Sequence, residues 1–386
     1  MVQRGLTGRY ETTEIAGEQV RAFVPNPLPP MAPLYLDAPL QRQLESAGLA
    51  LGRLDGVSTL LPDKSLFLYS YVRKEAVLSS QIEGTQSSLS DLLLFELDEA
   101  SGVPIHDVVE VSNYVSALTH GLARLQAGFP LSNRLLREIH GVLLSSGRGS
   151  AREPGEFRRS QNWIGGTRPG NATFVPPPPT CLEECMAELE RFLHSSELPA
   201  LVRAALAHVQ FETIHPFLDG NGRVGRLLIT LLLYHAGLLR EPLLYLSLYF
   251  KQNRRLYYDL LGGVRLTGDW EQWLSFFLSG VIETAEGAVS TAGRLADMFT
   301  AHRAEVQGGG RRAGSALRVH EVLKARPLLS LKQICDGTGL SFPAASSGMG
   351  LLIELGIARE FTGRRRNRLF VYDQYLSILN EGIEPA

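Results

Sequence analysis

The stretch HPFLDGNGRVGR, at residues 215–226, decides the fold and the chemistry that this sequence predicts. It follows an amphipathic run at residues 199–214 and leads directly into an apolar run at residues 227–239. That order predicts a helix, a tight polar loop and a second helix. The glycines let the loop bend and bring backbone N–H groups close to a ligand. The free N–H groups at the start of the second helix, aided by its dipole, predict an anion-binding site.

The polar side chains of this stretch add reactive groups to the anion site. His215 offers a base that titrates near neutral pH, and Asp219 offers a hard oxygen ligand for Mg²⁺. Arg223 and Arg226 are three residues apart on the first turn of the second helix, so both can reach the same anion. A base, a metal ligand, an anion cradle and two arginines together predict phosphate-ester chemistry.

Two other interpretations of the loop fit less well. Gly220, Gly222 and Gly225 spell the dinucleotide fingerprint G-x-G-x-x-G, but that fingerprint requires a preceding strand, and residues 200–214 have a helical pattern. The residues DGNG, at 219–222, also hint at a calcium loop, yet no acidic partners follow at the required offsets. The pattern therefore favours an anion site between two helices.

The whole stretch resembles the signature of the Fic family, H-P-F-x-[DE]-G-N-G-R-x-x-R, and matches it at every specified position. Fic proteins typically transfer AMP from ATP to a hydroxyl side chain of a target protein, and the resemblance implies a mainly α fold, a Fic-type helical bundle with a β-hairpin flap. It implies that His215 accepts the proton of the target hydroxyl and that Asp219 holds Mg²⁺ against the phosphates. The residues that it implies for ATP binding are Gly220, Asn221, Gly222, Arg223, Val224, Gly225 and Arg226, together with Glu83, Ile164, Gly165 and Tyr258.

A second informative stretch, SSQIEG at residues 79–84, stands at the end of an expected helix. Ser79 and Glu83 are four residues apart and share one helix face, with Gly84 as the expected C-cap. The stretch resembles the inhibitory motif of Fic proteins, [ST]-x-x-x-E-[GN], whose glutamate pairs with the second arginine of the signature, here Arg226. The resemblance implies that Glu83 occupies the guanidinium that would bind the γ-phosphate and holds the resting enzyme off.

Residues 154–179 change character, with strand-forming residues among glycines, asparagines and prolines. Two short extended segments around a turn predict a β-hairpin. It resembles the Fic flap, which covers the nucleotide and aligns the target's extended segment. Ile164 and Gly165 are the expected flap positions over the nucleotide. Further along, the tyrosine pair at residues 257–258 resembles one that borders the adenine pocket in Fic proteins, which makes Tyr258 a candidate for contact with the base.

The rest of the body predicts helices around these motifs. Residues 1–40 are rich in proline and turn formers and are expected to wrap over the surface in extended form. The predicted helices cover residues 38–61, a longer helix that begins at Pro62-Asp63, and residues 89–99, 105–126, 131–144 and 270–299.

The C-terminal part has a different composition. The residues QGGGRR, at 307–312, predict a flexible linker, and residues 311–370 then carry eleven Lys/Arg against four Asp/Glu, a net of +7 in a chain whose total is −2. Helices at residues 328–335 and 343–355, followed by a hairpin with a basic tip at residues 356–372, predict a small winged-helix domain. The basic tip suits DNA phosphates, but the second helix has no Arg, Asn or Gln to read bases. A protein contact or weak DNA binding is therefore favoured over sequence-specific recognition.

Length and composition favour two or three domains. We expect an N-terminal helical region with the inhibitory helix at residues 1–125, a Fic catalytic core at residues 126–300 and the winged helix at residues 301–386. The three cysteines are too few for a disulfide scaffold and favour a reducing cytoplasm. No apolar run reaches the ~18 residues of a membrane span, and the small net charge gives the whole molecule no general pull toward nucleic acid or membrane.

Other activities stay open from the sequence alone. The same site could run in reverse, with Glu83 orienting a water that removes AMP from a modified protein, or it could use another phosphate donor. A non-enzymatic regulator that senses ATP and acts through the winged helix is a further alternative, although an intact His215 argues against a pure sensor. The resemblance implies ATP and a protein with a Ser, Thr or Tyr hydroxyl as partners, and self-modification and a homodimer are compatible with it.

Overall fold

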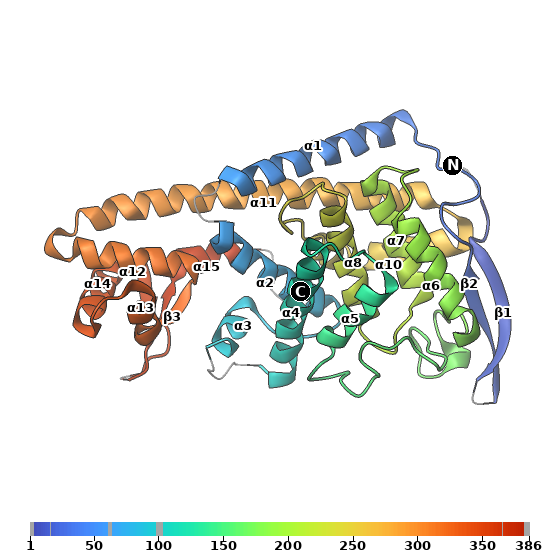
Figure 1. Ribbon diagram of the computed structural model, residues 1–386, viewed down its shortest axis with the longest axis horizontal. Coiled ribbons are helices and arrows are strands. Elements are labelled where there is room, and N and C mark those ends of the chain that lie inside the picture. The colour runs from blue at the N-terminus through green and yellow to red at the C-terminus, as the bar shows by residue number, and fades with distance from the viewer. Residues whose placement is uncertain (1–3, 16, 61–63, 98–102, 365, 382–386) are drawn as a thin grey trace.

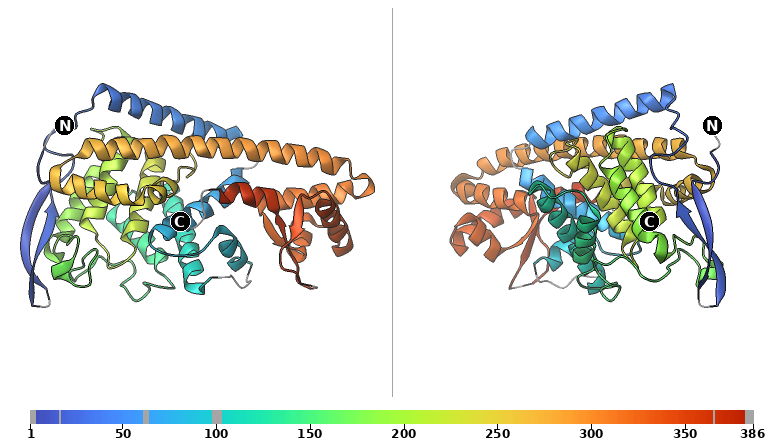
Figure 2. Two further views of the ribbon diagram at one scale, coloured as in Figure 1. Left: turned by 180° about the vertical axis from the view of Figure 1, so that it is seen from behind. Right: turned by 45° about the vertical axis from the view of Figure 1, so that its right-hand side comes forward.

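The fold is mainly helical, as the sequence predicts, and extends along one long helix, α11 (Trp270–Gln307). Helix α1 (Ala38–Leu60) packs along α11, which the views from the front and from behind both show (Figure 1, Figure 2). No helix within the described parts of the chain is long and apolar enough to cross a membrane. The computed structural model describes residues 4–15, 17–60, 64–97, 103–364 and 366–381.

Most of the predicted helices are confirmed. Those expected at residues 38–61, 105–126 and 131–144 are found within two residues of their predicted ends, and the helix expected at residues 89–99 ends at Phe95. The start predicted at Pro62-Asp63 lies outside the described residues. The further helices of the body are α2 (Lys64–Ile82), α3 (Leu89–Phe95), α4 (Ile105–Gln126), α5 (Asn133–Leu143), α6 (Pro179–Leu193), α7 (Ala200–Ile214), α8 (Asn221–His235), α9 (Ser247–Gln252) and α10 (Arg254–Thr267).

Helix α7 lies in the centre of the body and is buried on nearly all sides, so the amphipathic prediction for residues 199–214 is wrong. It packs against α6, α8, α10 and α11, and its polar residues, such as His208 and Glu212, are buried together with apolar ones such as Phe211. These polar residues resemble a solvent-facing side in the sequence. Because water does not reach them, their partners have to come from the surrounding helices.

Residues 8–15 and 18–25 form a β-hairpin, so the expectation of an extended surface wrap is wrong for them, whereas residues 26–37 run without helix or strand to α1. Strands β1 (Gly8–Ile15) and β2 (Glu18–Pro25) pair antiparallel at the end of the molecule opposite the C-terminal elements (Figure 1). The backbone N–H of Phe23 donates to the Val175 carbonyl at 2.9 Å, and the Phe23 ring is fully buried. One face of the hairpin is therefore part of the core, which the prolines beyond β2 concealed in the sequence.

The predicted flap contains much less sheet than a regular hairpin. Between α5 and α6, within the described residues, Ile164 pairs with Phe174 in an isolated antiparallel bridge, and the Ile164 N–H donates to the Phe174 carbonyl at 2.8 Å. Gly165 and Gly166 then turn the chain with φ values of 68° and 71°, and a 3-10 turn, η1 (Pro169–Asn171), follows. The glycines and prolines of this segment leave too few residues for a longer ladder.

The helix end predicted near Phe299 and the flexible linker predicted after it are both wrong. Helix α11 continues to Gln307, and the chain then turns tightly into α12 (Ala313–Ala325). A Cβ added at Gly309 would lie 2.2 Å from the Leu351 side chain, so the turn is packed against its neighbours. The glycines therefore permit a close helix-to-helix turn and do not form a loose spacer.

The C-terminal elements form a helix–turn–helix followed by a hairpin. The strands pair antiparallel in the order β3-β5-β4. Residues 328–330, predicted as helix, are a strand, and the helix begins after Ser330, which caps it by accepting from the Gln333 N–H. Arg365 of the predicted basic tip lies outside the described residues. The elements are η2 (Gly310–Arg312), α12, β3 (Leu328–Ser330), α13 (Leu331–Thr338), α14 (Phe342–Glu354), β4 (Ala358–Glu360), β5 (Leu369–Tyr372) and α15 (Asp373–Asn380).

Helix α15 brings the C-terminal elements back to α2. The hydroxyl groups of Tyr375 on α15 and Ser70 on α2 are both buried and lie 3.0 Å apart. Helix α2 also carries the start of the SSQIEG stretch at its end. The C-terminal helix α15 and helix α8 of the signature loop therefore both contact α2.

Candidate functional site

The loop between α7 and α8 is held in one shape by its own residues. His215 ends α7 in the left-handed conformation, with φ 49°, and Gly220, with φ 76°, begins α8. Between them the Asn221 side chain accepts from the Phe217 N–H and donates to the Phe217 carbonyl, both at 2.8 Å. The Phe217 ring is fully buried. The loop therefore presents the His215 ring and the start of α8 from one fixed turn.

The start of α8 is an open helix N-terminus that faces a carboxylate. No side chain of the described residues caps it, and the first N–H groups of a helix have no acceptor within the helix. A Cβ added at Gly222, in the first turn, would lie 2.2 Å from Glu83 Oε1. The Glu83 carboxylate therefore stands where the sequence predicts an anion site.

Arg226 is buried and is bound from the end of α2, as the resemblance implied. Its Nε donates to Ser79 Oγ at 2.8 Å, and its Nη2 donates to the Ser79 carbonyl at 2.9 Å and to Glu83 Oε1 at 2.7 Å. Directly after Glu83, Gly84 turns the chain away with φ 101°. Burial alone would raise the pKa of Glu83, but the Arg226 guanidinium outweighs it and holds that pKa below its usual value. Glu83 is therefore ionised at neutral pH.

Two more carboxyl groups, which the sequence analysis missed, lie deeper around Arg226. Glu75 on α2 accepts from Ser247 Oγ at 2.5 Å, and Glu212 on α7 lies against the backbone of Gly225. Burial raises the pKa of each carboxyl group to about 7, against the pull of their neighbours. The carboxylate at the end of α2 is therefore the fully charged partner that contacts the guanidinium directly.

Arg223 is held by another carboxylate that the sequence analysis missed. Glu110, buried in α4, accepts from Arg223 Nη1 at 3.1 Å and from Arg148 Nε at 2.9 Å. On its other side, Arg223 Nη2 lies 3.6 Å from Asp219 Oδ1, which also accepts from the Gly220 N–H at 2.6 Å. The buried guanidinium of Arg223 and the partly exposed carboxylate of Asp219 therefore lie side by side on the loop.

The His215 ring is in the state of a base. Its Nδ1 atom is buried and has no hydrogen-bond partner within the described residues. Burial, together with the charge of Arg158, lowers the pKa of His215 to about 4. The ring is therefore neutral at pH 7 and has a lone pair that can accept a proton.

A second histidine, His140 of α5, supports the loop from behind and was also missed. The Gly155 N–H donates to His140 Nδ1 at 2.8 Å, so the ring proton is on Nε2, which donates to the Asp219 carbonyl at 3.0 Å. The ring stacks on Phe217 with centroids 3.8 Å apart. A lone histidine on an apolar helix face gave no signal in the sequence, yet this one fixes the backbone that carries Asp219.

Of the two adjacent tyrosines, Tyr258 lies partly at the surface and Tyr257 is buried in the core. Tyr258 is 41% exposed, and burial of its remaining surface and the Glu83 charge raise its pKa, so its phenol lies within reach of the site's electrostatics. Tyr257 is buried, and its hydroxyl lies 2.8 Å from His208 Nε2. His208 Nδ1 in turn bonds the Gly225 carbonyl at 3.0 Å, which ties α10 to α7 and α8.

Val224 of the loop and Gly165 of the flap are both closely surrounded by other parts of the chain. Val224 is fully buried in the core. A Cβ added at Gly165 would lie 2.4 Å from Thr173 Oγ1, so the turn after Ile164 requires glycine. The flap stem is joined to the loop through Asn162, whose Nδ2 donates to the Phe217 carbonyl at 3.0 Å.

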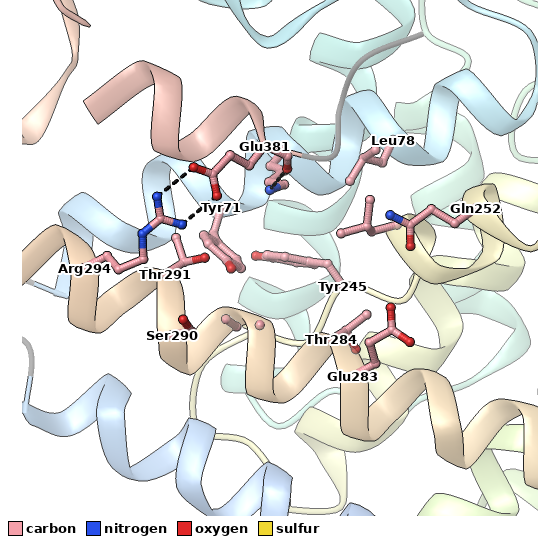
Figure 3. Close-up of a pocket in the computed structure, with 14 residues that line it drawn as sticks. Tyr71, Leu78, Tyr245, Gln252, Glu283, Thr284, Ser290, Thr291, Arg294 and Glu381 are labelled. Carbon is pink, nitrogen blue, oxygen red and sulfur yellow. Dashed lines mark hydrogen bonds and ion pairs between the residues drawn. The ribbon is translucent and has the colours of Figure 1, made fainter. Parts of the chain in front are cut away.

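Another face of α2 lines a cavity of about 300 Å³ (Figure 3). Tyr71 and Lys74 of α2 face it together with Arg294 of α11 and Glu381, which follows α15. Lys74 Nζ donates to the Glu381 carbonyl at 2.8 Å, and the Glu381 carboxylate accepts from Arg294 at 2.6 and 2.7 Å. Helix α2 is therefore bound at its end by Arg226 and along its back by the C-terminal elements.

Comparison with known proteins finds related sequences and folds. Residues 41–123 match the family profile described as Fic/DOC family N-terminal, and residues 130–233 match the profile described as Fic/DOC family. Relatives named Protein adenylyltransferase Fic, from Drosophila yakuba and Drosophila melanogaster, are 45% and 44% identical over 112 residues, which is 28% of this chain. The chain covers about a fifth of the length of these relatives, 20% in each case.

A solved structure resembles most of the chain. It is a Fic family protein from Desulfovibrio desulfuricans G20, with a TM-score of 0.58 and 21% identity, and the match covers 88% of this chain and 97% of that one. At this identity the likeness concerns the fold alone.

Proposed function

This chain belongs to the Fic/DOC family, and we propose that it is a protein adenylyltransferase, which transfers AMP from ATP to a Ser, Thr or Tyr hydroxyl of a target protein. One observation carries the proposal. The neutral ring of His215, the open N-terminus of α8 and the cations Arg223 and Arg226 meet on a single loop. A proton acceptor beside an anion site is what the attack of a hydroxyl on a phosphate requires.

In this mechanism the target hydroxyl attacks the α-phosphate while its proton passes to His215. The new bond joins the target oxygen to the α-phosphorus, and the bond to the β-phosphate oxygen breaks, so that pyrophosphate leaves. The backbone N–H groups of Asn221 and Gly222, together with Arg223 and Arg226, bind the phosphates and neutralise the developing charge, while the Gly220 N–H stays on Asp219 Oδ1. The proposed borders of the nucleotide are Val224 and Gly225 behind the phosphates, and Ile164, Gly165 and Tyr258 around the base and ribose.

We propose that Asp219 holds Mg²⁺ together with the phosphates. Among the residues that the structure describes, no three His, Cys, Asp or Glu side chains gather to enclose a metal. A single, partly exposed carboxylate nevertheless fits magnesium, which keeps waters and phosphate oxygens as its other ligands. Such an ion neutralises phosphate charge when it is bound. Arg223 orients the Asp219 carboxylate and His140 fixes its backbone.

We propose further that Glu83 inhibits the resting enzyme. Its carboxylate occupies the Arg226 guanidinium and stands against Gly222 at the start of α8, where the phosphates are proposed to bind. A triphosphate would lose this cation and meet a like charge. Because a change of about 1.4 kcal/mol is tenfold in rate, we expect Glu83→Gly to raise AMP transfer by at least about tenfold.

The test is label transfer from α-³²P-ATP with Mg²⁺ to the enzyme itself and to the proteins of a cell lysate. Wild type, Glu83→Gly and the double variant Glu83→Gly/His215→Ala are compared. We expect weak labelling by wild type, strong labelling by the single variant and none by the double variant. Labelling that survives the loss of His215 would contradict its role as the base. No labelling by any of the three would contradict AMP transfer, and loss of label from a pre-modified target would then reveal the reverse reaction.

We propose that the C-terminal elements form a winged-helix domain that contacts protein. In support, the order of α12, β3, α13, α14, β4 and β5 is that of a helix–turn–helix with a wing. Helix α14 exposes Phe342 and Ile353, at 62% and 39%, and carries no Arg, Asn or Gln to read bases. Sequence-dependent retention of duplex DNA in a gel-shift assay would contradict this proposal. The proposed domains are residues 1–125, 126–300 and 301–386.

We propose that the enzyme acts in the cytoplasm, which the free thiols of all three cysteines support. Self-modification and a homodimer are further proposals. Labelling of the enzyme in the absence of lysate tests the first, and the mass in solution tests the second.

A further inference from the structure

Arg158, which precedes the flap bridge, binds the end of α7. Its Nε donates to the His215 carbonyl at 3.0 Å, its Nη2 to the Ile214 carbonyl at 3.4 Å, and its backbone N–H to the Pro216 carbonyl at 2.9 Å. The last carbonyls of a helix receive no hydrogen bond from an N–H group of the same helix, and they lie at the negative end of its dipole. Arg158 therefore caps α7 at the residue that carries the base.

The same guanidinium also binds the stem of the flap. Its Nη2 donates to the Pro177 carbonyl at 2.5 Å, and its Nη1 donates to the Ser160 carbonyl at 3.3 Å. Both sides of the flap stem are thereby joined to the end of α7 by one side chain.

Arg158 carries a charge that hydrogen bonding alone does not explain. The residue is 2% exposed, and within the described parts of the chain no carboxylate forms an ion pair with it. Burial lowers the pKa of Arg158 to about 10, so the guanidinium is still charged at neutral pH. Burying a cation without a counter-ion is costly. The Arg158 side chain donates to four carbonyls, which the two N–H groups of an amide could not do, and its charge also acts on a neighbour.

That neighbour is His215, whose backbone is held in an uncommon conformation. A residue other than glycine keeps a left-handed φ of 49° only where its surroundings fix it. The charged or polar groups that act on its ring are Arg158, Glu83 at the end of α2, Arg265 of α10 and the backbone of Glu212. Glu83 and the Glu212 backbone favour the protonated ring, whereas the two arginines oppose it.

We propose that Arg158 is the positioning residue of the base: it fixes the backbone of His215 through the carbonyls at the end of α7, and its positive charge opposes protonation of the buried ring. The inference rests on the proposed function, because it concerns the proton acceptor of that reaction. It also assigns to the flap stem a part in the chemistry, in addition to covering the nucleotide.

The test compares Arg158→Gln, which removes the charge and keeps an N–H donor, with Arg158→Lys, which keeps the charge. Both are made in the Glu83→Gly variant. Arg203→Gln is the control, because Arg203 also donates to a backbone carbonyl, that of Ser195, away from the loop. We expect the apparent pKa of the acid limb of the pH profile of kcat/KM to be higher in Arg158→Gln and unchanged in Arg158→Lys and in the control. An unchanged limb in Arg158→Gln would overturn the inference.

A second measurement separates this inference from the proposed function. NMR of the protein with ¹⁵N-labelled histidine follows the His215 ring without nucleotide or target. We expect His215 to titrate well below pH 6.5 in wild type, and at a higher pH in Arg158→Gln. Equal titration in both proteins, or a wild-type value at or above 6.5, would overturn the inference even if AMP is transferred. A shifted titration in a protein that transfers no AMP would overturn only the proposed function.

Discussion

Two buried arginines stand at the loop between α7 and α8, and they have different partners. Arg226 is 3% exposed and is bound by Glu83 and Ser79, which belong to another helix, α2. Arg158 is 2% exposed and is bound by backbone carbonyls of α7 and of the flap stem. The partners of Arg226 lie at the end of another helix, whereas those of Arg158 belong to the backbone of the loop and of the flap stem.

The proposed inhibition makes the first contact a regulatory one and the second a part of the site. The end of α2 is proposed to compete with the substrate, and Lys74 on the back of the same helix donates to the carbonyl of Glu381 (Figure 3). Helix ends held by a few side chains open at a lower free energy than main-chain networks in a core. Arg226 therefore has a carboxylate, a hydroxyl and one carbonyl as partners, whereas the side chain of Arg158 has carbonyls only.

The largest expected effect is on the free energy of unfolding, and it tests directly whether Arg158 and Arg226 differ in their contribution to stability. Arg158→Met leaves several buried carbonyls without a donor, and each such group costs about 1–3 kcal/mol. We expect the free energy of unfolding to fall by about 3–5 kcal/mol. Glu83→Gln should cost only about 1–2 kcal/mol, because Glu83 keeps 33% of its side chain exposed and an amide can still accept from Arg226. Urea unfolding followed by circular dichroism measures both, and equal losses would contradict the distinction.

His208 offers a further comparison with Arg158, because its buried side chain also binds a backbone carbonyl but is uncharged at neutral pH. Burial lowers the pKa of His208 to about 3. The folded state therefore binds fewer protons than the unfolded state between pH 6.5 and about 3, and stability is lost as the pH falls through this window. The loss is about 1.4 kcal/mol per pH unit, or about 2 kcal/mol at pH 5.

The measurement for His208 is unfolding by urea at pH 7 and at pH 5. Wild type should lose stability between the two, whereas His208→Asn, which keeps one polar contact and cannot be protonated, should be less stable at pH 7 but lose less. A loss of the same size in both proteins would place the acid sensitivity in other groups.

How much the sequence predicts depends on whether a residue's partners are close to it in the chain. The loop at residues 215–226 could be predicted, because its residues are contiguous. The pairing of Glu83 with Arg226, which lie 143 residues apart, was implied only by the resemblance to the Fic family. Arg158, His140 and Glu110 could not be predicted, since their partners lie far away in the chain and an isolated Arg, His or Glu looks like surface.

The errors in the predicted fold have the same origin. The β1–β2 hairpin was missed because its core face becomes evident only through contact with Val175, far along the chain. The linker at residues 307–312 was predicted as flexible from its glycines, whereas Leu351 packs so closely that the turn needs a residue without a side chain. Glycine composition alone does not distinguish a loose spacer from a tight turn.

Glu110 provides a third case, a carboxylate that pairs with an arginine of α8 but supports activity. It binds Arg223 from α4 and leaves the start of α8 free. In the Glu83→Gly variant, Glu110→Gln should therefore lower kcat/KM for ATP by about tenfold, about 1.4 kcal/mol, opposite in sign to the loss of Glu83. Label transfer at varied ATP concentration measures it. Glu138→Gln is the control, since Glu138 pairs with Arg124 away from the loop, and an increase in activity in Glu110→Gln would contradict its supporting role.

The smallest expected effect concerns Ser79, which shares Arg226 with Glu83. Its hydroxyl accepts from Arg226 Nε at 2.8 Å, a hydrogen bond whose loss leaves the Glu83 carboxylate in place. Such a bond is worth about 0.5–1.5 kcal/mol, so Ser79→Ala should raise basal AMP transfer by about threefold, well short of Glu83→Gly. Ser80→Ala is the matched control, because the neighbouring Ser80 hydroxyl is buried without a hydrogen-bond partner within the described residues. If Ser79→Ala activates as strongly as Glu83→Gly, the inhibition depends on the position of α2 against Arg226 and not on the Glu83 charge. If Ser79→Ala and Ser80→Ala behave alike, the carboxylate alone holds Arg226, and the contrast with the shared carbonyl network of Arg158 becomes sharper.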